Sequence, residues 1–238
     1  AKQLETFEAL GGTGLVTKIK TGEIIAITSL PDYDPNRYAT AKTEALFNQA
    51  TKGVFEMGSI FKVLNTAIAL EEGSAGLNST YDVTRPLRVG SFPIRDYHPY
   101  DRFLNLSEVF VFSSNIGSAR IAEDISPNIQ RSYMDKLGLL ERPTLELTET
   151  ARPLYPARWG RLSSYTISFG HGISVSPIHV AGAVSAAAGT GEFIAPTLLK
   201  RRPDELFERV RIFSDETTRK VRSMMRLAVS HKDGTANF

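Results

Sequence analysis

Residues 58–73 read GSIFKVLNTAIALEEG, and this stretch decides the fold. Its apolar residues wrap most of the circumference of a helix that we predict from about Ser59 to Glu72, and Gly73 ends it. A helix that is apolar nearly all round is buried inside its domain. The rest of the chain should therefore pack around this helix, and a charged side chain on it needs a role or a partner.

Ser59 and Lys62 stand three positions apart at the start of this helix. Residues at this spacing are neighbours, and helical side chains lean toward the N-terminus, so the amine can meet the hydroxyl. Burial disfavours the charged form of a lysine and lowers its pKa, which suits Lys62 to act as a base. The first turn of a helix also offers free backbone N–H groups to a developing oxyanion. The pattern indicates an activated serine.

A chance occurrence must be weighed against that interpretation, because a Ser-x-x-Lys pair is expected about once in a chain of this length. The buried position of Lys62 is what favours catalysis. Ser113-Ser114-Asn115 is a second candidate, since it interrupts a helical pattern, and a simple interhelical loop is the alternative. Gly234-Thr235-Ala236, after Lys232-Asp233, suits a strand edge beside a ligand backbone, and a frayed C-terminus is the alternative.

Strands are predicted at the start of the chain and helices after them. Residues 14–19 and 23–28 predict a β-hairpin around a Thr21-Gly22 turn, and their dense apolar residues predict a sheet covered on both faces. Residues 141–164 are predicted as loop. Further helices are predicted within 106–121, 129–137, 177–188 and 214–229. Strands are expected again at the end, which favours an α+β domain with one antiparallel sheet.

The composition excludes several classes of protein. The chain has 238 residues, 42% apolar and 23% charged, which is ordinary for a globular domain and excludes collagen, coiled coil and wholesale disorder. A net charge of +2 gives no field that would attract nucleic acid. The absence of cysteine excludes disulfides and a thiol nucleophile. Packing or surface roles are predicted for four histidines without metal-ligand spacing, His98, His171, His179 and His231, and local packing for Trp159.

Together these motifs resemble the transpeptidase domain of class B penicillin-binding proteins. Ser59-Ile60-Phe61-Lys62, after Glu56-Met57-Gly58, is similar to the E-P-G-S-x-x-K segment of that family, with Met57 in place of proline. Ser113-Ser114-Asn115-Ile116-Gly117 is similar to the S-S-N-x-G of its division-type members. Further agreeing stretches are 20–26, 30–36, 95–99 and 169–177. The match covers nearly the whole chain, and we predict the septal, FtsI-type subclass.

The resemblance implies a mostly antiparallel five-stranded sheet sandwiched by helices, with the nucleophile helix buried behind it. It also implies acyl transfer in peptidoglycan cross-linking. Ser59 would attack the penultimate D-Ala carbonyl of a stem peptide, and Lys62 would take its proton. Ser113 would relay a proton to the departing D-Ala, and Asn115 would hold the substrate amide. β-Lactams would acylate Ser59, and no metal or organic cofactor is implied.

The third motif of the family, K-T-G, departs from the pattern here. A literal Lys20-Thr21-Gly22 precedes the nucleophile and lies in the predicted hairpin turn, so we do not assign it to the site. The expected triplet follows the last helix, where residues 232–236 read KDGTA, with Asp233 in place of threonine or serine. We assign Gly234 and Thr235 to substrate binding, with the backbone N–H groups of Thr235 and Ser59 as the oxyanion hole. We also expect a transpeptidase domain over 1–238 that lacks segments near and after Gly234.

The resemblance further implies partners and a location. Stem peptides and β-lactam antibiotics are the expected ligands, division-machinery membrane proteins are the expected partners, and nucleic acid is not expected. No apolar run approaches the roughly 18 residues of a membrane span. We therefore interpret the chain as the periplasmic domain of an inner-membrane protein whose N-terminal anchor lies outside it.

Three alternatives remain open from the sequence. A serine β-lactamase shares the nucleophile but needs a deacylation base, such as the glutamate of an E-x-x-L-N loop, and no such string is present. A non-catalytic β-lactam sensor would be acylated but would never transpeptidate. A structural α+β domain would make all three motifs accidents, which their joint order disfavours.

Overall fold

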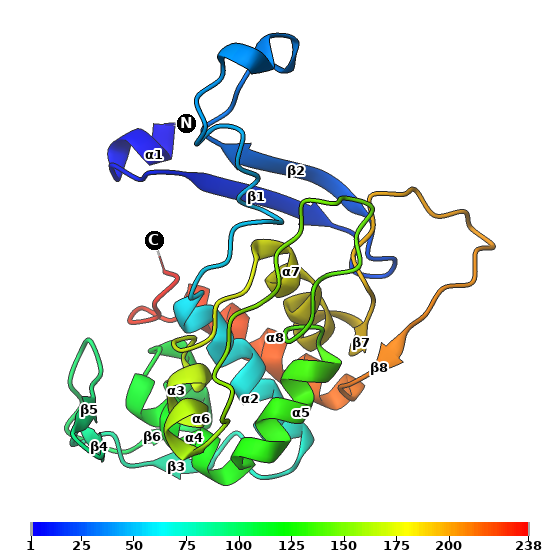
Figure 1. The fold of residues 1–238 in the computed structure, drawn as a ribbon. Coiled ribbons are helices and arrows are strands. Elements are labelled where there is room, and N and C mark those ends of the chain that lie inside the picture. The colour runs from blue at the N-terminus through cyan, green and yellow to red at the C-terminus, as the bar shows by residue number, and fades with distance from the viewer. Residues whose placement is uncertain (1, 238) are drawn as a thin grey trace.

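The computed structural model describes residues 2–237, which form a helical body with a β-hairpin beside it (Figure 1). The helices are α1 (Lys2–Thr6), α2 (Phe61–Glu71), α3 (Leu106–Val111), α4 (Asn115–Ile125), α5 (Pro127–Lys136), α6 (Arg161–Ser168), α7 (Pro177–Ser185) and α8 (Asp215–Ser230). The strands are β1 (Gly12–Thr17), β2 (Ile24–Leu30), β3 (Thr80–Tyr81), β4 (Leu87–Val89), β5 (Phe92–Ile94), β6 (Leu104–Asn105), β7 (Glu192–Phe193) and β8 (Val210–Arg211). This mixture confirms the predicted α+β class.

Helix α2 lies at the centre of the helical body, as its sequence predicts. Phe61, Leu64 and Ile68 are fully buried, and α4, α6 and α8 pack around the helix (Figure 1). The α-helix begins two residues later than predicted, because Gly58–Ile60 forms a 3₁₀ turn that leads into it. Ser59 therefore lies in a tightened turn at the entrance of the most buried helix.

The predicted interruption at Ser113-Ser114-Asn115 is confirmed, because the chain passes there from α3 to α4. Each helix has its own N-terminal cap. Asn105 and Glu108 form a capping box at the start of α3, with both hydrogen bonds at 2.9 Å. At the start of α4, the Ser114 hydroxyl accepts the N–H of Gly117 at 2.8 Å. Because each cap is formed by residues close in sequence, the local sequence sets where α4 begins and so places the break between α3 and α4 at Ser113-Ser114-Asn115.

The predicted hairpin around Thr21-Gly22 is confirmed, but its burial is not. β1 and β2 pair antiparallel over their whole length. Neither strand holds a buried residue, and Val16 and Ile25 are each 56% exposed. The prediction of a sheet covered on both faces is therefore wrong. The physical reason is that helix α7, the one helix with substantial contacts to this hairpin among residues 2–237, covers one side only.

The five-stranded sheet of the prediction is not formed by residues 2–237. Four separate two-stranded antiparallel sheets are present, which pair β1 with β2, β3 with β6, β4 with β5, and β7 with β8. Strands β3 to β8 are only two or three residues long, too short to extend the hairpin into a broad sheet. The strands expected at the end of the chain are also not found, since residues 215–237 form α8 and turns.

Helix α6 occupies part of the predicted 141–164 loop. It begins at Arg161, and Gly160 before it provides no side-chain cap. Its sequence, RLSSYTIS, is rich in serine and threonine, which are weak helix formers. Tyr165 and Ile167 are buried where the helix packs against α4. Tertiary packing therefore stabilises a helix that could not be predicted from local helix propensity.

Candidate active site

The hydroxyl of Ser59 and the amine of Lys62 meet at the start of α2, as their spacing predicts. Ser59 Oγ and Lys62 Nζ are 3.2 Å apart. Ser59 is exposed to solvent, whereas Lys62 is only 4% exposed. The backbone N–H of Ser59 lies in the first helical turn, where N–H groups have no acceptor within the helix. One turn thus combines an accessible hydroxyl with a buried amine.

Ser113 joins this pair from the turn between α3 and α4. Its Oγ lies 3.1 Å from Ser59 Oγ and 2.8 Å from Lys62 Nζ. Its backbone carbonyl also accepts a hydrogen bond from Nζ, at 2.5 Å. The φ angle of Ser113 is 56°, a left-handed conformation that is costly for a residue with a side chain. In this conformation both oxygens of Ser113 bond to the amine, and we call Ser59, Lys62 and Ser113 the catalytic cluster.

Burial gives Lys62 the acid–base properties of a base that works near neutral pH. Desolvation lowers the pKa of its amine from 10.5 to about 8, and the negative charge of Asp96 opposes part of this shift. At pH 7, a group with a pKa near 8 is neutral in about a tenth of the molecules. The neutral amine has a lone pair that can accept the proton of Ser59.

Asp96 is a residue of the site that sequence reasoning missed. Its carboxylate accepts hydrogen bonds from the hydroxyl of Ser114 at 2.7 Å and from the backbone N–H groups of Asn115 and Ile116 at 2.5 and 3.0 Å. The carboxylate therefore sits at the N-terminus of α4, the end of a helix that attracts anions. Asp96 is 18 positions from Ser114, so no local pattern in the sequence announces this contact.

The segment 169–172 packs against the turn that carries the nucleophile. The N–H of Gly58 donates to the carbonyl of Gly170 at 3.2 Å, and the N–H of Gly172 donates to Glu56 Oε1 at 2.7 Å. The φ angles of Gly170 and Gly172 are 81° and 75°. A Cβ atom on Gly170 would overlap the backbone of Gly58. The close approach that supports the Ser59 turn therefore requires glycine at position 170.

Replacing Gly170 by alanine should destabilise the protein more than the same change at Gly73. Both glycines have left-handed backbones, with φ of 81° and 65°, so each variant should lose about 1 kcal/mol on that account. At Gly73 no atom lies within 4 Å of the added Cβ, whereas at Gly170 it meets backbone. We expect a further loss of about 2 kcal/mol for Gly170→Ala, measured by chemical denaturation. Equal stabilities of the two variants would contradict this close packing.

The other predicted site residues have partners outside the catalytic cluster. Asn115, at the start of α4, donates from its side-chain amide to the carbonyl of Arg95 at 3.2 Å. Thr235 donates hydrogen bonds from its N–H and from its hydroxyl to the carbonyl of Val111, each at 3.2 Å. In this structure the Thr235 N–H, which we predicted as an oxyanion donor, is therefore bonded to the last residue of α3. Gly234 lies in the turn that follows α8. The substrate-binding roles of these residues stay predictions.

The remaining residues singled out from the sequence have packing or hydrogen-bonding roles away from the catalytic cluster. Lys20-Thr21-Gly22 forms the turn between β1 and β2, where Thr21 Oγ1 donates to Glu23 Oε2 at 2.7 Å. The local packing role predicted for Trp159 is confirmed, since it is 8% exposed and donates to Gln130 Oε1 at 3.0 Å. His179 is buried in α7, and its burial lowers the pKa of its imidazole.

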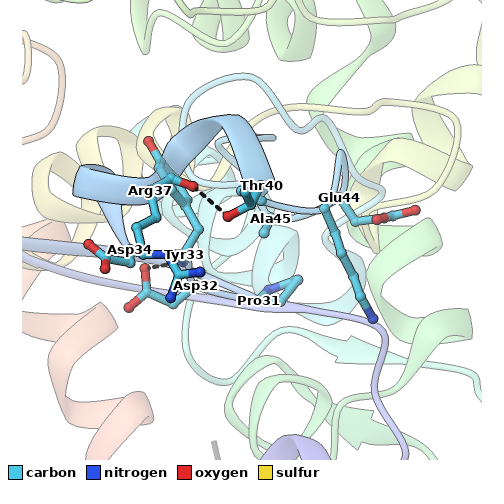
Figure 2. A pocket seen from close by; sticks show the side chains of 10 residues that line it. Pro31, Asp32, Tyr33, Asp34, Arg37, Thr40, Glu44 and Ala45 are labelled. Carbon is cyan, nitrogen blue, oxygen red and sulfur yellow. Dashed lines mark hydrogen bonds between the residues drawn. The ribbon is translucent and has the colours of Figure 1, made fainter.

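Figure 2 shows an open pocket of about 440 Å³ in the loop after β2. Its lining comes entirely from residues 31–45, and Thr40 Oγ1 donates there to the carbonyl of Arg37 at 2.9 Å. None of the predicted site residues borders this pocket, which is therefore separate from the catalytic cluster. Among residues 2–237, no group of three or more potential ligand side chains is arranged to hold a metal ion. No helix of this part of the chain has the length and apolar character to cross a bilayer.

The chemistry open to the catalytic cluster is the removal of a proton from an exposed serine hydroxyl and its transfer to a neighbouring hydroxyl. This is the chemistry of serine acyltransferases. Comparison with known families agrees: residues 12–238 match the model described as the penicillin binding protein transpeptidase domain. The chain belongs to this family.

Individual relatives support the same placement. A probable peptidoglycan D,D-transpeptidase FtsI from Caulobacter vibrioides is 40% identical over 233 residues, which are 98% of this chain and 40% of the relative. The peptidoglycan D,D-transpeptidase FtsI of Escherichia coli is 30% identical over 92% of this chain and 37% of its own length. This chain thus spans about two fifths of the length of these relatives. The similarity confirms the predicted FtsI-type subclass.

Solved structures give the same result for the fold. The transpeptidase domain of penicillin-binding protein 3 from Burkholderia pseudomallei superposes with a TM-score of 0.85 and 28% identity, over 98% of this chain and 66% of that one. A protein from Burkholderia ambifaria described as a peptidoglycan glycosyltransferase has a TM-score of 0.86 and 29% identity, over 98% of this chain and 70% of that one. The transpeptidase fold is therefore confirmed, although residues 2–237 do not form the five-stranded sheet of the prediction.

Proposed function

We propose that this chain carries the acylation centre of a peptidoglycan D,D-transpeptidase that cross-links stem peptides. The observation that carries the proposal is the contact of Ser59, Lys62 and Ser113 within 3.2 Å of one another, at the N-terminus of a buried helix. Membership of the transpeptidase family and the names of the FtsI relatives support it.

In the proposed reaction, the neutral amine of Lys62 takes the proton of Ser59 Oγ as that oxygen attacks the penultimate D-Ala carbonyl. The backbone N–H of Ser59 stabilises the developing oxyanion. The C–N bond to the terminal D-Ala then breaks. The proton passes from the Lys62 ammonium through Ser113 Oγ, 2.8 Å away, to the departing amine. An amine of a second stem peptide resolves the acyl-enzyme and regenerates Ser59.

The other parts of the proposal concern ligands and setting. Asn115 holds the substrate amide, and Gly234 and Thr235 bind the substrate beside it. β-Lactams acylate Ser59 and remain bound. The setting is septal cell-wall synthesis, next to membrane proteins of the division machinery. We place the chain in the periplasm, as part of an inner-membrane protein.

The test is covalent labelling of the full-length protein by a fluorescent penicillin, with peptide mapping and a time course of several hours. A label on the Ser59 peptide that persists, together with release of D-Ala and formation of a cross-linked product from pentapeptide stems, is the expected result. Rapid loss of the label as hydrolysed penicillin would favour a β-lactamase. A persistent label without D-Ala release would favour a sensor. No label on the intact protein would contradict all three.

A further inference from the structure

Asp96 connects the end of strand β5 to the turn that supplies Ser113. The two oxygens of its carboxylate bond to different groups. Oδ2 accepts a hydrogen bond from the hydroxyl of Ser114 at 2.7 Å. Oδ1 accepts from the backbone N–H groups of Asn115 and Ile116 at 2.5 and 3.0 Å. Hydrogen bonds to an ionised acceptor are roughly twice as strong as neutral ones. Three of them on one carboxylate fix the first residues of α4 relative to the segment after β5.

This anchorage bears directly on Ser113, the residue that precedes Ser114. The left-handed φ of 56° at Ser113 is strained and persists only where its surroundings enforce it. On the other side of the turn, α3 ends at Val111. Ser113 is therefore held between the end of α3 and the start of α4, and Asp96 fixes the position of that start. The result of this restraint is that both oxygens of Ser113 bond to the amine of Lys62, at 2.5 and 2.8 Å.

The charge of Asp96 has a second effect on the same amine. The Lys62 amine contacts the hydroxyl of Ser59 from the turn before α2 and both oxygens of Ser113 from the α3–α4 turn. The carboxylate of Asp96, in the segment after β5, acts on the amine through its charge. Among the described residues, Asp96 is the one charged group found to perturb the Lys62 pKa, and it raises it against desolvation. Tyr100, further along the same segment, has its pKa raised by burial and then by Asp96 and Asp233.

We propose that Asp96 is a positioning residue that holds the Ser113 turn against the Lys62 amine. The proposal rests on the proposed acyltransferase function. Asp96 does not touch the reacting atoms and acts through Ser113 and Lys62. Its loss should therefore change both the maximal rate of acylation and the pH at which that rate is half reached.

The experiment measures the second-order rate of β-lactam acylation of the full-length protein between pH 6 and 10, for wild type, Asp96→Asn and Asp96→Ala. The asparagine retains an oxygen for the backbone N–H groups but no charge, so it should move the midpoint of the profile below pH 8 and lower the plateau by about tenfold. The alanine also releases the turn, and its plateau should fall about a hundredfold, as expected for a misplaced catalytic group.

Asp34→Asn is the matched control. Asp34 also accepts a backbone N–H at the start of a helical turn, at 2.9 Å from Asn36, but it belongs to the loop after β2. Its profile should equal that of wild type. Wild-type midpoints and plateaus in both Asp96 variants would overturn the proposal. So would equal losses in both variants with an unmoved midpoint and a lowered melting temperature, since that pattern marks a merely structural role. If Asp96→Ala does not fold, Asp96→Asn alone decides.

Failure of the proposed function gives a different result, because wild type itself would then not be acylated at Ser59. The role of Asp96 can still be decided in that case. An NMR titration of the ¹³Cε signal of Lys62 reads the amine directly in the unreacted protein. A lower midpoint in Asp96→Asn than in wild type supports the proposal, and identical midpoints overturn it.

Discussion

Replacing Ser59 by alanine is expected to abolish covalent labelling by penicillin, whereas replacing Ser113 by alanine should only slow it. Both serines must be tested because either hydroxyl could lose its proton to the Lys62 amine, which lies 3.2 Å from Ser59 Oγ and 2.8 Å from Ser113 Oγ. Ser59 is the exposed member and has the first-turn N–H of a helix beside it, where an oxyanion can be stabilised. Ser113 is half-buried and lies where a proton can be relayed.

The measurement is intact-mass spectrometry after incubation with excess penicillin, followed by peptide mapping. No adduct is expected on Ser59→Ala at any time. A rate reduced by about 10²-fold to 10⁴-fold is expected for Ser113→Ala, the usual range for loss of a proton-transfer group. Ser74→Ala, in a serine that bonds only to the nearby carbonyl of Ala69, is the control and should label like wild type. An adduct on the Ser113 peptide would instead identify Ser113 as the nucleophile and leave Ser59 as the proton relay.

Replacing Lys62 by methionine should lower the acylation rate by about 10³-fold or more while the protein stays folded. Methionine retains the length of the side chain but has no basic nitrogen, so the proton of Ser59 has no acceptor. In wild type the rate should rise with pH through the Lys62 pKa of about 8, because only the neutral amine is a base. The variant should lose this rise. A variant with wild-type rates would exclude Lys62 as the base.

The same substitution should have a pH-dependent effect on stability. Burial lowers the pKa of Lys62 from 10.5 to about 8, so the unfolded chain binds a proton more tightly than the folded one. The resulting cost to folding is complete below pH 8 and disappears above pH 10.5, and it amounts to about 3 kcal/mol. Relative to wild type, Lys62→Met should therefore be more stable at pH 7 than at pH 10, by about 2 kcal/mol. Denaturation at both pH values measures this difference.

Lys20→Met provides the control for that comparison. Lys20 is exposed in the turn between β1 and β2, so its replacement should give the same relative stability at both pH values. A stability difference for Lys62→Met that does not change between pH 7 and pH 10 would contradict the lowered pKa. Buried Lys62 would then contribute to packing alone.

Elements with strong local signals were predictable from the sequence. The all-round apolar pattern of α2 identified the buried helix. The helix predicted within 214–229 corresponds to α8, where the hydroxyl of Ser214 caps the first turn by accepting the N–H of Thr217 at 3.2 Å. Helix α6 was not predictable, because its Ser- and Thr-rich sequence has weak propensity and its helical state depends on packing against α4. The five-stranded sheet of the prediction is not formed by the described residues, and local sequence could not decide this, because strand pairing depends on distant partners rather than on neighbours.

The sequence by itself determined the buried helix, the three-residue spacing of Ser59 and Lys62, and the break at Ser113-Ser114-Asn115, because each depends on residues within a few positions of one another. Only the tertiary structure decided what these parts do together. It brought Ser113 against Ser59 across 54 positions and placed Asp96 on the α4 N-terminus across 18 positions or more. It also set the depth of burial that lowers the pKa of Lys62 to about 8. Side chains far apart in the chain meet only after the helices pack, and desolvation exists only once that packing has excluded water.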